Sequence, residues 1–333
     1  MASGSTAGVS VRDVAGSGPL VAVGGSVSVQ LWGSPDGRSP LLPKHVLRGG
    51  TDSAPLDAMG SIQMERAVLK KMEEGGVRVA RFRPPKPYAW RRLNNRTHRK
   101  LLIADGKVGM TGGVGIAEEW TGNAQDPDHW RDTHVRVRGS IVRGLQGAFA
   151  ENWLEATGEV LVGEQYLPEL GDVNGGGPMQ VVRSSATVGD TDMEALYFLA
   201  IASAQKSIEL TAAYFAPRPA FTDALCEAAE RGVDIRILVP GPHIDKDFVR
   251  VAGRACYDEL LGCGVRIFEY QPTMMHAKAL VVDGAWSAVG SVNYDARSFE
   301  LNDEVVLCVQ GSDFARGLDE VFAQDLSRSR EID

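Results

Sequence analysis

Two segments of this sequence carry the same four residues at the same spacing. Residues 98–106 and residues 276–284 both read H-x-K-x-x-x-x-D-G. Four fixed residues, each at odds of about one in twenty, rarely coincide by chance in one chain, and two copies are far rarer. The catalytic set that the repeat predicts is His98, Lys100, Asp105, His276, Lys278 and Asp283.

Two imidazoles and two ammonium groups suit the transfer of a phosphodiester without a metal. One neutral imidazole can attack phosphorus and form a phosphohistidine. The other, protonated, can donate to the departing oxygen and then act as base on the incoming hydroxyl. Lys100 and Lys278 stand two residues after their histidines, so on a strand they share a face with them and would bind the non-bridging oxygens. We therefore expect neither a metal nor another cofactor.

The aspartates of the two motifs have a different expected place. Asp105 and Asp283 stand five residues after the lysine and directly before a turn glycine, which favours holding the motif loop over touching substrate. A glycine-rich turn follows each motif. In these turns Gly113, Ser291 and Asn293 are expected to bind the substrate phosphate with neutral donors.

Asp132 and Glu304 occupy equivalent places after the two motifs, each a few residues before a glycine. A carboxylate there could accept the Nδ1–H of a motif histidine and fix its tautomer, as in catalytic triads. An ordinary acid at a strand edge is the alternative. We expect both acids to orient the motif histidines.

The elements around the motifs repeat as well. This predicts an α/β fold of two pseudo-symmetric halves, with mixed sheets flanked by helices and the active site at the interface of the halves. Each motif is expected to lie between two strands, with a helix closing the half. The expected strands are residues 76–82, 133–139, 264–270 and 305–311, and the expected closing helices are residues 144–151 and 317–324.

The halves differ at their beginnings. The second half opens with a β-α-β pattern at residues 207–240, and the first half shows no counterpart. Residues 1–54 are rich in Gly, Ser and Pro and are expected to be poorly ordered, apart from one strand at residues 26–32. A Gly-rich linker at residues 171–178 separates the first half, residues 55–172, from the second, residues 173–333.

Composition narrows the class of protein. The sequence has no apolar run of about 18 residues and no N-terminal signal pattern, so we expect no membrane span and no secretory leader. The net charge of −8 disfavours non-specific binding to nucleic acid. Cysteine spacing does not suggest a metal site, which favours buried free thiols in a reducing compartment. The four cysteines are Cys226, Cys256, Cys263 and Cys308.

A basic stretch runs into the first motif. Residues 78–100 contain nine Lys or Arg residues, no acid and three interleaved aromatic residues. Arg91, Arg92 and Arg96 are expected to form a rim that collects anionic headgroups at the mouth of the site. A solvated charged loop and a surface for stacked bases are the alternatives.

The two motifs resemble those of the phospholipase D superfamily, and their flanks resemble its bacterial cardiolipin synthase branch. The flanks that carry the likeness are NRTHRK at residues 95–100, HWRDTH at 129–134, FAENW at 149–153 and SFELNDE at 298–304. The likeness covers roughly residues 57–330. It implies two phospholipase D-like halves and places the nucleophile, His98, in the first. Relatives include lipid hydrolases, phosphatidyltransferases and nucleases, so the substrate class stays open.

The sequence departs from this family in three places. The strand and helix that usually open the first half are missing or unrecognisable, and the N-terminal membrane helices usual in cardiolipin synthases are absent. Gly115 stands where the second copy has Asn293. The last departure bears on one polar contact to the phosphate and not on the chemistry of the histidines.

We therefore interpret the chain as a phosphatidyltransferase or phospholipase of the cardiolipin synthase type. It would take the phosphatidyl group of phosphatidylglycerol onto His98 and pass it to a second phosphatidylglycerol. The expected partner is anionic phospholipid rather than nucleic acid, the expected place is cytoplasmic and peripheral on the inner face of the membrane, and the oligomeric state is open. A nuclease that uses the same histidines and an inactive, truncated member are the alternatives.

Overall fold

The computed structural model describes most of the chain from residue 77 onward. The described ranges are residues 77–84, 95–115, 117–122, 124–170, 177–185 and 191–333, together with Lys70, residues 73–75 and four strands within residues 10–57. Arg91, Arg92 and residues 171–176 of the expected linker lie outside them. The division of the chain at residue 172 therefore stays a prediction.

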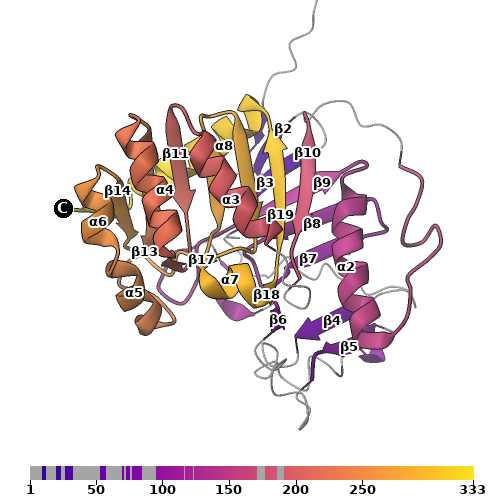
Figure 1. Cartoon of the computed structure of the whole chain (residues 1–333). Helices are drawn as coiled ribbons and strands as arrows, with labels where there is room; N and C mark the ends of the chain where they lie inside the picture. Colours follow the sequence, from indigo (N-terminus) through magenta and orange to yellow (C-terminus); the bar gives the residue numbers. More distant parts are fainter. Residues whose placement is uncertain are drawn as a thin grey trace, which may run out of the picture.

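The second half is built on one mixed sheet of eight strands (Figure 1). In spatial order these are β10 (Met179–Arg183), β19 (Val305–Gln310), β16 (Trp286–Gly290), β15 (Ala279–Val282), β11 (Ser207–Thr211), β13 (Asp234–Pro240), β14 (Arg266–Tyr270) and β20 (Ser329–Ile332). Strands β11, β13 and β14 are parallel, and the other pairs are antiparallel. This sheet contains the β-α-β unit that the sequence predicts.

Helices cover both faces of this sheet because its strands carry apolar residues on both. The helices of this half are α3 (Asp192–Ser203), α4 (Pro219–Glu230), α5 (Asp247–Arg254), α6 (Tyr257–Gly262), α7 (Ala296–Glu300) and α8 (Ser312–Leu326). Buried residues of α3, α4 and α6 form one core with one sheet face, and α8 packs against the other. Figure 1 shows α3 and α4 in front of the sheet.

The first half forms a six-stranded sheet whose pairs are all antiparallel. Its strands in spatial order are β1 (Ser10–Arg12), β2 (Leu20–Val23), β3 (Val27–Trp32), β9 (Asp132–Arg138), β8 (Val108–Gly112) and β7 (Leu101–Ala104), and its helix is α2 (Val142–Thr157). In the second half, β11 pairs with the motif strand β15. Among the described strands, none pairs with the corresponding edge of β7. The expected mixed sheet is therefore present only in the second half.

One expectation about the N-terminal side needs correction. Three strands, β1 to β3, lie within residues 1–54, and β3 coincides with the strand expected at 26–32; the expected poor order of the rest of this segment stays a prediction. The expected strand at 76–82 is β5 (Arg78–Phe82), but it pairs with β4 (Ser53–Asp57) instead of joining the main sheet. In the second half, β14 joins the sheet through β13 and β11. No counterparts of β11 and β13 are described in the first half, so β5 has no neighbouring strand through which it could join the sheet beside β7.

The two halves share a core. Val135 and Val137 of β9 and Leu145 of α2 cluster with Val289 and Leu307 of the second sheet, and all are buried. Two short ladders join distant segments at the lower edge in Figure 1: β6 (Arg96–Thr97) with β18 (Asn302–Asp303), and β12 (Phe215–Ala216) with β17 (Tyr294–Asp295). The shared core fixes the relative position of the two motifs.

The expectation of four free thiols is wrong for two of them. Cys226 of α4 and Cys263, directly after α6, form a disulfide with a Cα–Cα distance of 5.4 Å. Cys256 and Cys308 are free. Because disulfides persist mainly in oxidising compartments, this bond does not support the expected reducing surroundings. In the described part of the chain no helix is long and apolar enough to cross a membrane.

Candidate active site

Each motif histidine is attached through its backbone to the other half of the protein. The His98 N–H donates to the Asp303 carbonyl at 2.9 Å, and the His276 N–H donates to the Arg131 carbonyl at 2.7 Å. Each acceptor stands directly before one of the two acids singled out in the sequence. The backbone therefore sets each imidazole beside an acid of the opposite half.

Both imidazoles bind that acid through Nδ1. His98 Nδ1 lies 3.0 Å from each carboxylate oxygen of Glu304, and His276 Nδ1 lies 2.8 Å from Asp132 Oδ2. A carboxylate accepts only when Nδ1 carries the proton, which leaves Nε2 with a free lone pair. The pairing is reciprocal, because each half supplies the acid for the histidine of the other.

The two carboxylates are fully buried, and each accepts three hydrogen bonds. Asp132 accepts from His276 Nδ1, Trp120 Nε1 and the Thr133 N–H. Glu304 accepts from His98 Nδ1, the Ser291 hydroxyl and Asn302 Nδ2. Burial by itself would raise the pKa of both acids, but the interaction with the histidine, these hydrogen bonds and the charge of a motif lysine, Lys278 for Asp132 and Lys100 for Glu304, lower it. Both acids are therefore carboxylates near neutral pH.

The two lysines lie close enough to interact electrostatically. Lys100 Nζ donates to the His98 carbonyl at 3.2 Å, and Lys278 Nζ donates to the His276 carbonyl at 2.6 Å. Lys278 is 1% exposed. Burial is the largest cause that lowers the pKa of Lys100, to about 8, and that of Lys278, to about 7; repulsion between the two ammonium groups lowers the second further. A bound phosphate anion would relieve this repulsion.

Burial also lowers the pKa of both histidines. The pKa of His276 falls to about 3. After burial, the charges of Lys278 and Lys100 lower this pKa further, whereas Asp132 raises it. The pKa of His98 is lowered as well, mainly by burial. The side chain of His98 is 25% exposed and that of His276 is 5% exposed. Both imidazoles are thus neutral in the free site, and His98 is the more accessible.

A buried arginine also holds the backbone of each acid. Arg99 Nε donates to the Glu304 carbonyl at 3.2 Å, and the same guanidinium reaches α2 and the Ser184 carbonyl. Arg131 Nη1 donates to the Asp132 carbonyl, and Arg131 forms a paired salt bridge with Asp325 of α8, at 2.7 and 2.9 Å. Arg99, at a variable position of the first motif, and Arg131, directly before Asp132, therefore help to place the two carboxylates.

The glycine-rich turns differ between the halves for a physical reason. A Cβ at Gly113 would lie 2.1–2.7 Å from the Asp132 carboxylate, so only glycine lets that acid stay in place. Ser291, at the matching position, donates its hydroxyl to Glu304. In the first half the indole of Trp120 supplies the corresponding donor, at 2.8 Å from Asp132. Gly113 and Ser291 contact the acids directly; their binding of phosphate stays a prediction.

Three aromatic side chains enclose His276, and the sequence argument did not assign them to the site. The ring centroids of Trp120 and Trp130 each lie 5.3 Å from the imidazole, and that of Tyr214 lies 6.4 Å away. Trp120 belongs to a short 3-10 helix, Glu118–Trp120. The flank that contains Trp130 was a signal for it, but nothing in the spacing of Trp120 or Tyr214 indicated this contact.

Two further predicted residues lie beside the motifs. Asn293 is buried, and its Oδ1 has no hydrogen-bond partner among the described residues, which leaves this amide available to a ligand. Arg96 of β6 is only partly exposed, and its Nη1 is buried. Arg91 and Arg92 lie outside the described residues, so the rim of Arg91, Arg92 and Arg96 stays a prediction.

The aspartates of the motifs lie away from the reacting groups. Asp283 follows β15, at the opposite end from His276, and its carboxylate accepts the backbone N–H groups of Gln205, Lys206 and Ser207. It therefore joins the motif loop to the start of β11, as its position before a glycine suggested, and it does not belong in the catalytic set. Asp105 is exposed at the corresponding turn, which has no described counterpart of β11.

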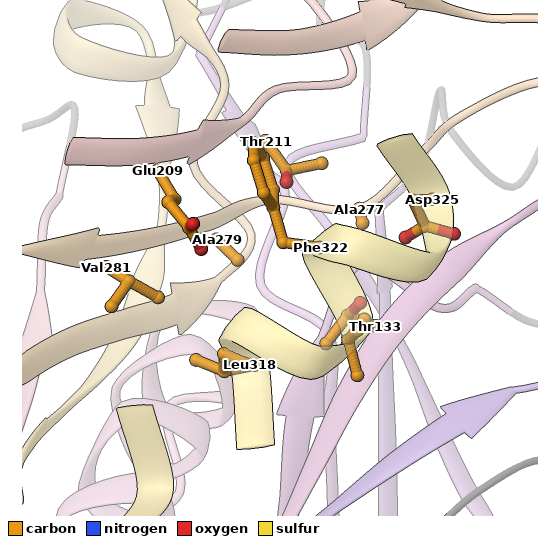
Figure 2. Close-up of a pocket in the computed structure, with 10 residues that line it drawn as sticks. Thr133, Glu209, Thr211, Ala277, Ala279, Val281, Leu318, Phe322 and Asp325 are labelled. Atoms are coloured by element: carbon orange, nitrogen blue, oxygen red, sulfur yellow. The ribbon is translucent and has the colours of Figure 1, made fainter. Parts of the chain in front are cut away.

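Residues that alternate with the catalytic ones face away from the site. Ala277, Ala279 and Val281 line a small cavity with Leu318 and Asp325 on the α8 side of the sheet (Figure 2). Its volume is about 10 Å³, which is at most the space of one water. His276 and Lys278 project to the other side, as the two-residue period of a strand requires.

These pKa shifts predict a bell-shaped pH profile for cleavage of a soluble phosphodiester. The value of kcat/KM should fall as pH rises through about 7 to 8, because Lys278 and Lys100 lose the protons that bind the phosphate. It should fall on the acid side only below the usual histidine pKa, because burial lowers that of His98. The alkaline limb of kcat should lie at higher pH, since bound phosphate stabilises the ammonium groups. A kcat/KM that is flat from pH 7 to pH 9 would contradict the lysine assignment.

Substituting Gly113 with alanine should lower kcat by about 10²-fold, because the added Cβ displaces Asp132 and misplaces His276. The matched control is Gly262→Ala, where a Cβ meets nothing within 4 Å. Both variants are assayed on the same soluble diester, and thermal melting checks folding. Equal activity of the two variants would show that the enzyme tolerates displacement of the Asp132 carboxylate by a Cβ at residue 113.

Comparisons with known proteins agree with the sequence and the geometry. Residues 197–326 match the family model described as cardiolipin synthase, PLD-like domain. A cardiolipin synthase of Geobacillus sp. (strain WCH70) is 37% identical over 279 residues, which are 83% of this chain and 55% of that protein. A probable cardiolipin synthase of Bacillus subtilis (strain 168) is 36% identical over 278 residues, with the same coverage. The chain thus spans about half the length of the curated relatives it matches.

The fold has a solved counterpart as well. The phosphatidylserine synthase of Haemophilus influenzae Rd KW20 superposes with a TM-score of 0.60 over 91% of this chain and 87% of that one, at 12% identity. This likeness confirms the predicted α/β fold of two halves and nothing finer. By its two motifs, their reciprocal arrangement and these relatives, the chain resembles the phospholipase D superfamily, and its residues 197–326 match a domain of the cardiolipin synthase type.

Proposed function

We propose that this chain is a phosphatidyltransferase that acts on anionic phospholipid, with phosphatidylglycerol as both donor and acceptor. One observation carries the proposal. Two imidazoles, each bound through Nδ1 to a buried carboxylate of the opposite half, stand at one site with the buried Lys278 and the half-buried Lys100. The relatives named cardiolipin synthases support the choice of substrate class.

The first step would begin with neutral His98. Its Nε2 forms a bond to phosphorus, and the bond from phosphorus to the oxygen of the headgroup glycerol breaks. His276 donates its proton to that oxygen, so glycerol leaves. The greater exposure of His98, 25% against 5%, supports its role as nucleophile. Glu304 would stabilise the positive charge that develops on the His98 ring.

His276 suits the acid role for an electrostatic reason. Its pKa of about 3 in the free site means that, once protonated, it is a strong acid towards a basic leaving oxygen. The negative charge of the bound phosphodiester is what would let it hold a proton at neutral pH. Binding of the anionic substrate and charging of the acid are therefore coupled.

The second step would reverse the first with a new alcohol. His276, now neutral, takes the proton of a hydroxyl on a second phosphatidylglycerol. That oxygen attacks phosphorus, and the bond between phosphorus and His98 Nε2 breaks. The product is a lipid with two phosphatidyl groups on one glycerol. Water in place of the lipid alcohol would give hydrolysis. We place the protein peripherally at a membrane surface, with the inner face as the expected side.

Product analysis on phosphatidylglycerol vesicles tests the substrate class. We expect the two-phosphatidyl lipid and free glycerol, in amounts unaffected by EDTA, because the lysines rather than a metal supply the positive charge. Single-stranded DNA in a parallel reaction should stay intact. Cleaved DNA with unchanged lipid would favour the nuclease alternative, and inhibition by EDTA that one divalent ion reverses would contradict the role of the lysines.

Variants of the two histidines separate their roles. His276→Asn should block reaction with a natural diester, whose alkoxide needs a proton, with a loss of roughly 10²–10⁴-fold. The same variant should still react with a p-nitrophenyl phosphodiester, whose leaving group needs none. Since it lacks the base for the second step, an acid-labile adduct should accumulate on His98, detected by intact mass.

The reverse variant is the control. His98→Asn should give no adduct with either substrate. An adduct on His276 in the His98→Asn protein, and none in the His276→Asn protein, would show that the two roles are exchanged.

A further inference from the structure

Helix α5 exposes an apolar face at the edge of the sheet where the active site lies. Phe248 and Val251 are each 72% exposed, and Ala252 is exposed beside them. At spacings of three and four residues these side chains share one face of the helix. Large apolar side chains that gather on a single exposed face mark an interaction surface more often than scattered ones do.

The opposite face of α5 is held firmly, so the orientation of the apolar face is set. A Cβ at Gly253 would lie 2.2 Å from the Phe215 carbonyl, which shows how closely the helix approaches β12. Arg254 and Arg250 bind the buried Glu269, at 2.6 and 3.3 Å. The helix therefore cannot roll to bury Phe248 and Val251 against its own sheet without breaking these contacts.

The same helix is continuous with the wall of the active site. Val249 packs in one cluster with Trp130 and Tyr214, two of the rings that enclose His276. Lys246, directly before α5, is exposed, lies 5.0 Å from the centroid of Tyr214 and acts electrostatically on Lys100. Figure 1 shows α5 at the lower left of the second half, below β13.

We propose that α5 docks the protein on an anionic bilayer, with Phe248 and Val251 inserted in the acyl layer and Lys246 at the level of the phosphates. This inference rests on the proposed function, because a diester that is part of a lipid must be reached from the membrane surface. An apolar face with a cation beside it is typical of an interfacial helix. Two exposed acids, Asp245 and Asp247, stand on either side of Lys246, and Asp245 accepts the Tyr214 hydroxyl, so the apolar residues supply most of the binding. The active-site wall next to α5 would then open on the headgroup layer.

Vesicle sedimentation with mixed phosphatidylglycerol and phosphatidylcholine tests the docking without requiring activity. Phe248→Ser should bind about tenfold more weakly, the loss expected for one buried aromatic ring, and adding Val251→Ser should weaken binding further. Phe248→Trp should restore it. The control is Leu199→Ser, because Leu199 is 64% exposed on a different helix, α3. Circular dichroism and thermal melting confirm that every variant is folded.

Turnover then separates this inference from the proposed function. On vesicles, activity should fall with binding in Phe248→Ser. On a short-chain, monomeric phosphatidylglycerol the same variant should match the wild type, since the histidines and lysines are untouched. Unchanged vesicle binding and vesicle turnover would overturn the role of α5, as would loss of self-association in Phe248→Ser with vesicle binding intact. A wild type that does not react with the monomeric lipid would instead refute the proposed function.

Discussion

The interaction on which the site depends is the hydrogen bond from each histidine to a carboxylate of the opposite half. His98 to Glu304 and His276 to Asp132 are buried contacts that neither half can make alone. Leaving a buried carboxylate without its partners costs several kcal/mol, on the order of 3–5 kcal/mol for a buried charge. The shared core between the two sheets therefore has a chemical role, because it holds these pairs in place as well as burying apolar surface.

Burial is what gives the four motif side chains their reactivity. It lowers the pKa of both lysines towards neutrality and keeps both imidazoles uncharged before substrate binds. The free site thus contains fewer positive charges than its residues would carry in water. A bound phosphodiester reverses this, since its charge favours the protonated lysines and a protonated His276. Substrate affinity and the protonation needed for catalysis rise together.

The halves reach equivalent geometry with different residues. Ser291 donates to Glu304, whereas Gly113 makes room for Asp132 and Trp120 supplies the donor. Arg99 and Arg131 each hold the backbone of one acid. The aspartates differ as well, because Asp283 has the backbone of β11 to bind and Asp105 has no such strand among the described residues. The first half has no β-α unit among its described residues, which changes the support of a loop and leaves the two histidine–carboxylate pairs in place.

Sequence alone predicted which residues react, and it predicted that two similar halves carry them. The spacing of histidine and lysine follows the two-residue period of a strand, so their common face could be predicted without coordinates, and Asp132 and Glu304 were identified by their matching places in the repeat. Tertiary structure decided which acid serves which histidine. It also decided the ring contacts of Trp120 and Tyr214, the disulfide of Cys226 with Cys263 and the exposed face of α5. These depend on how elements distant in sequence pack together, and local periodicity carries no information about that.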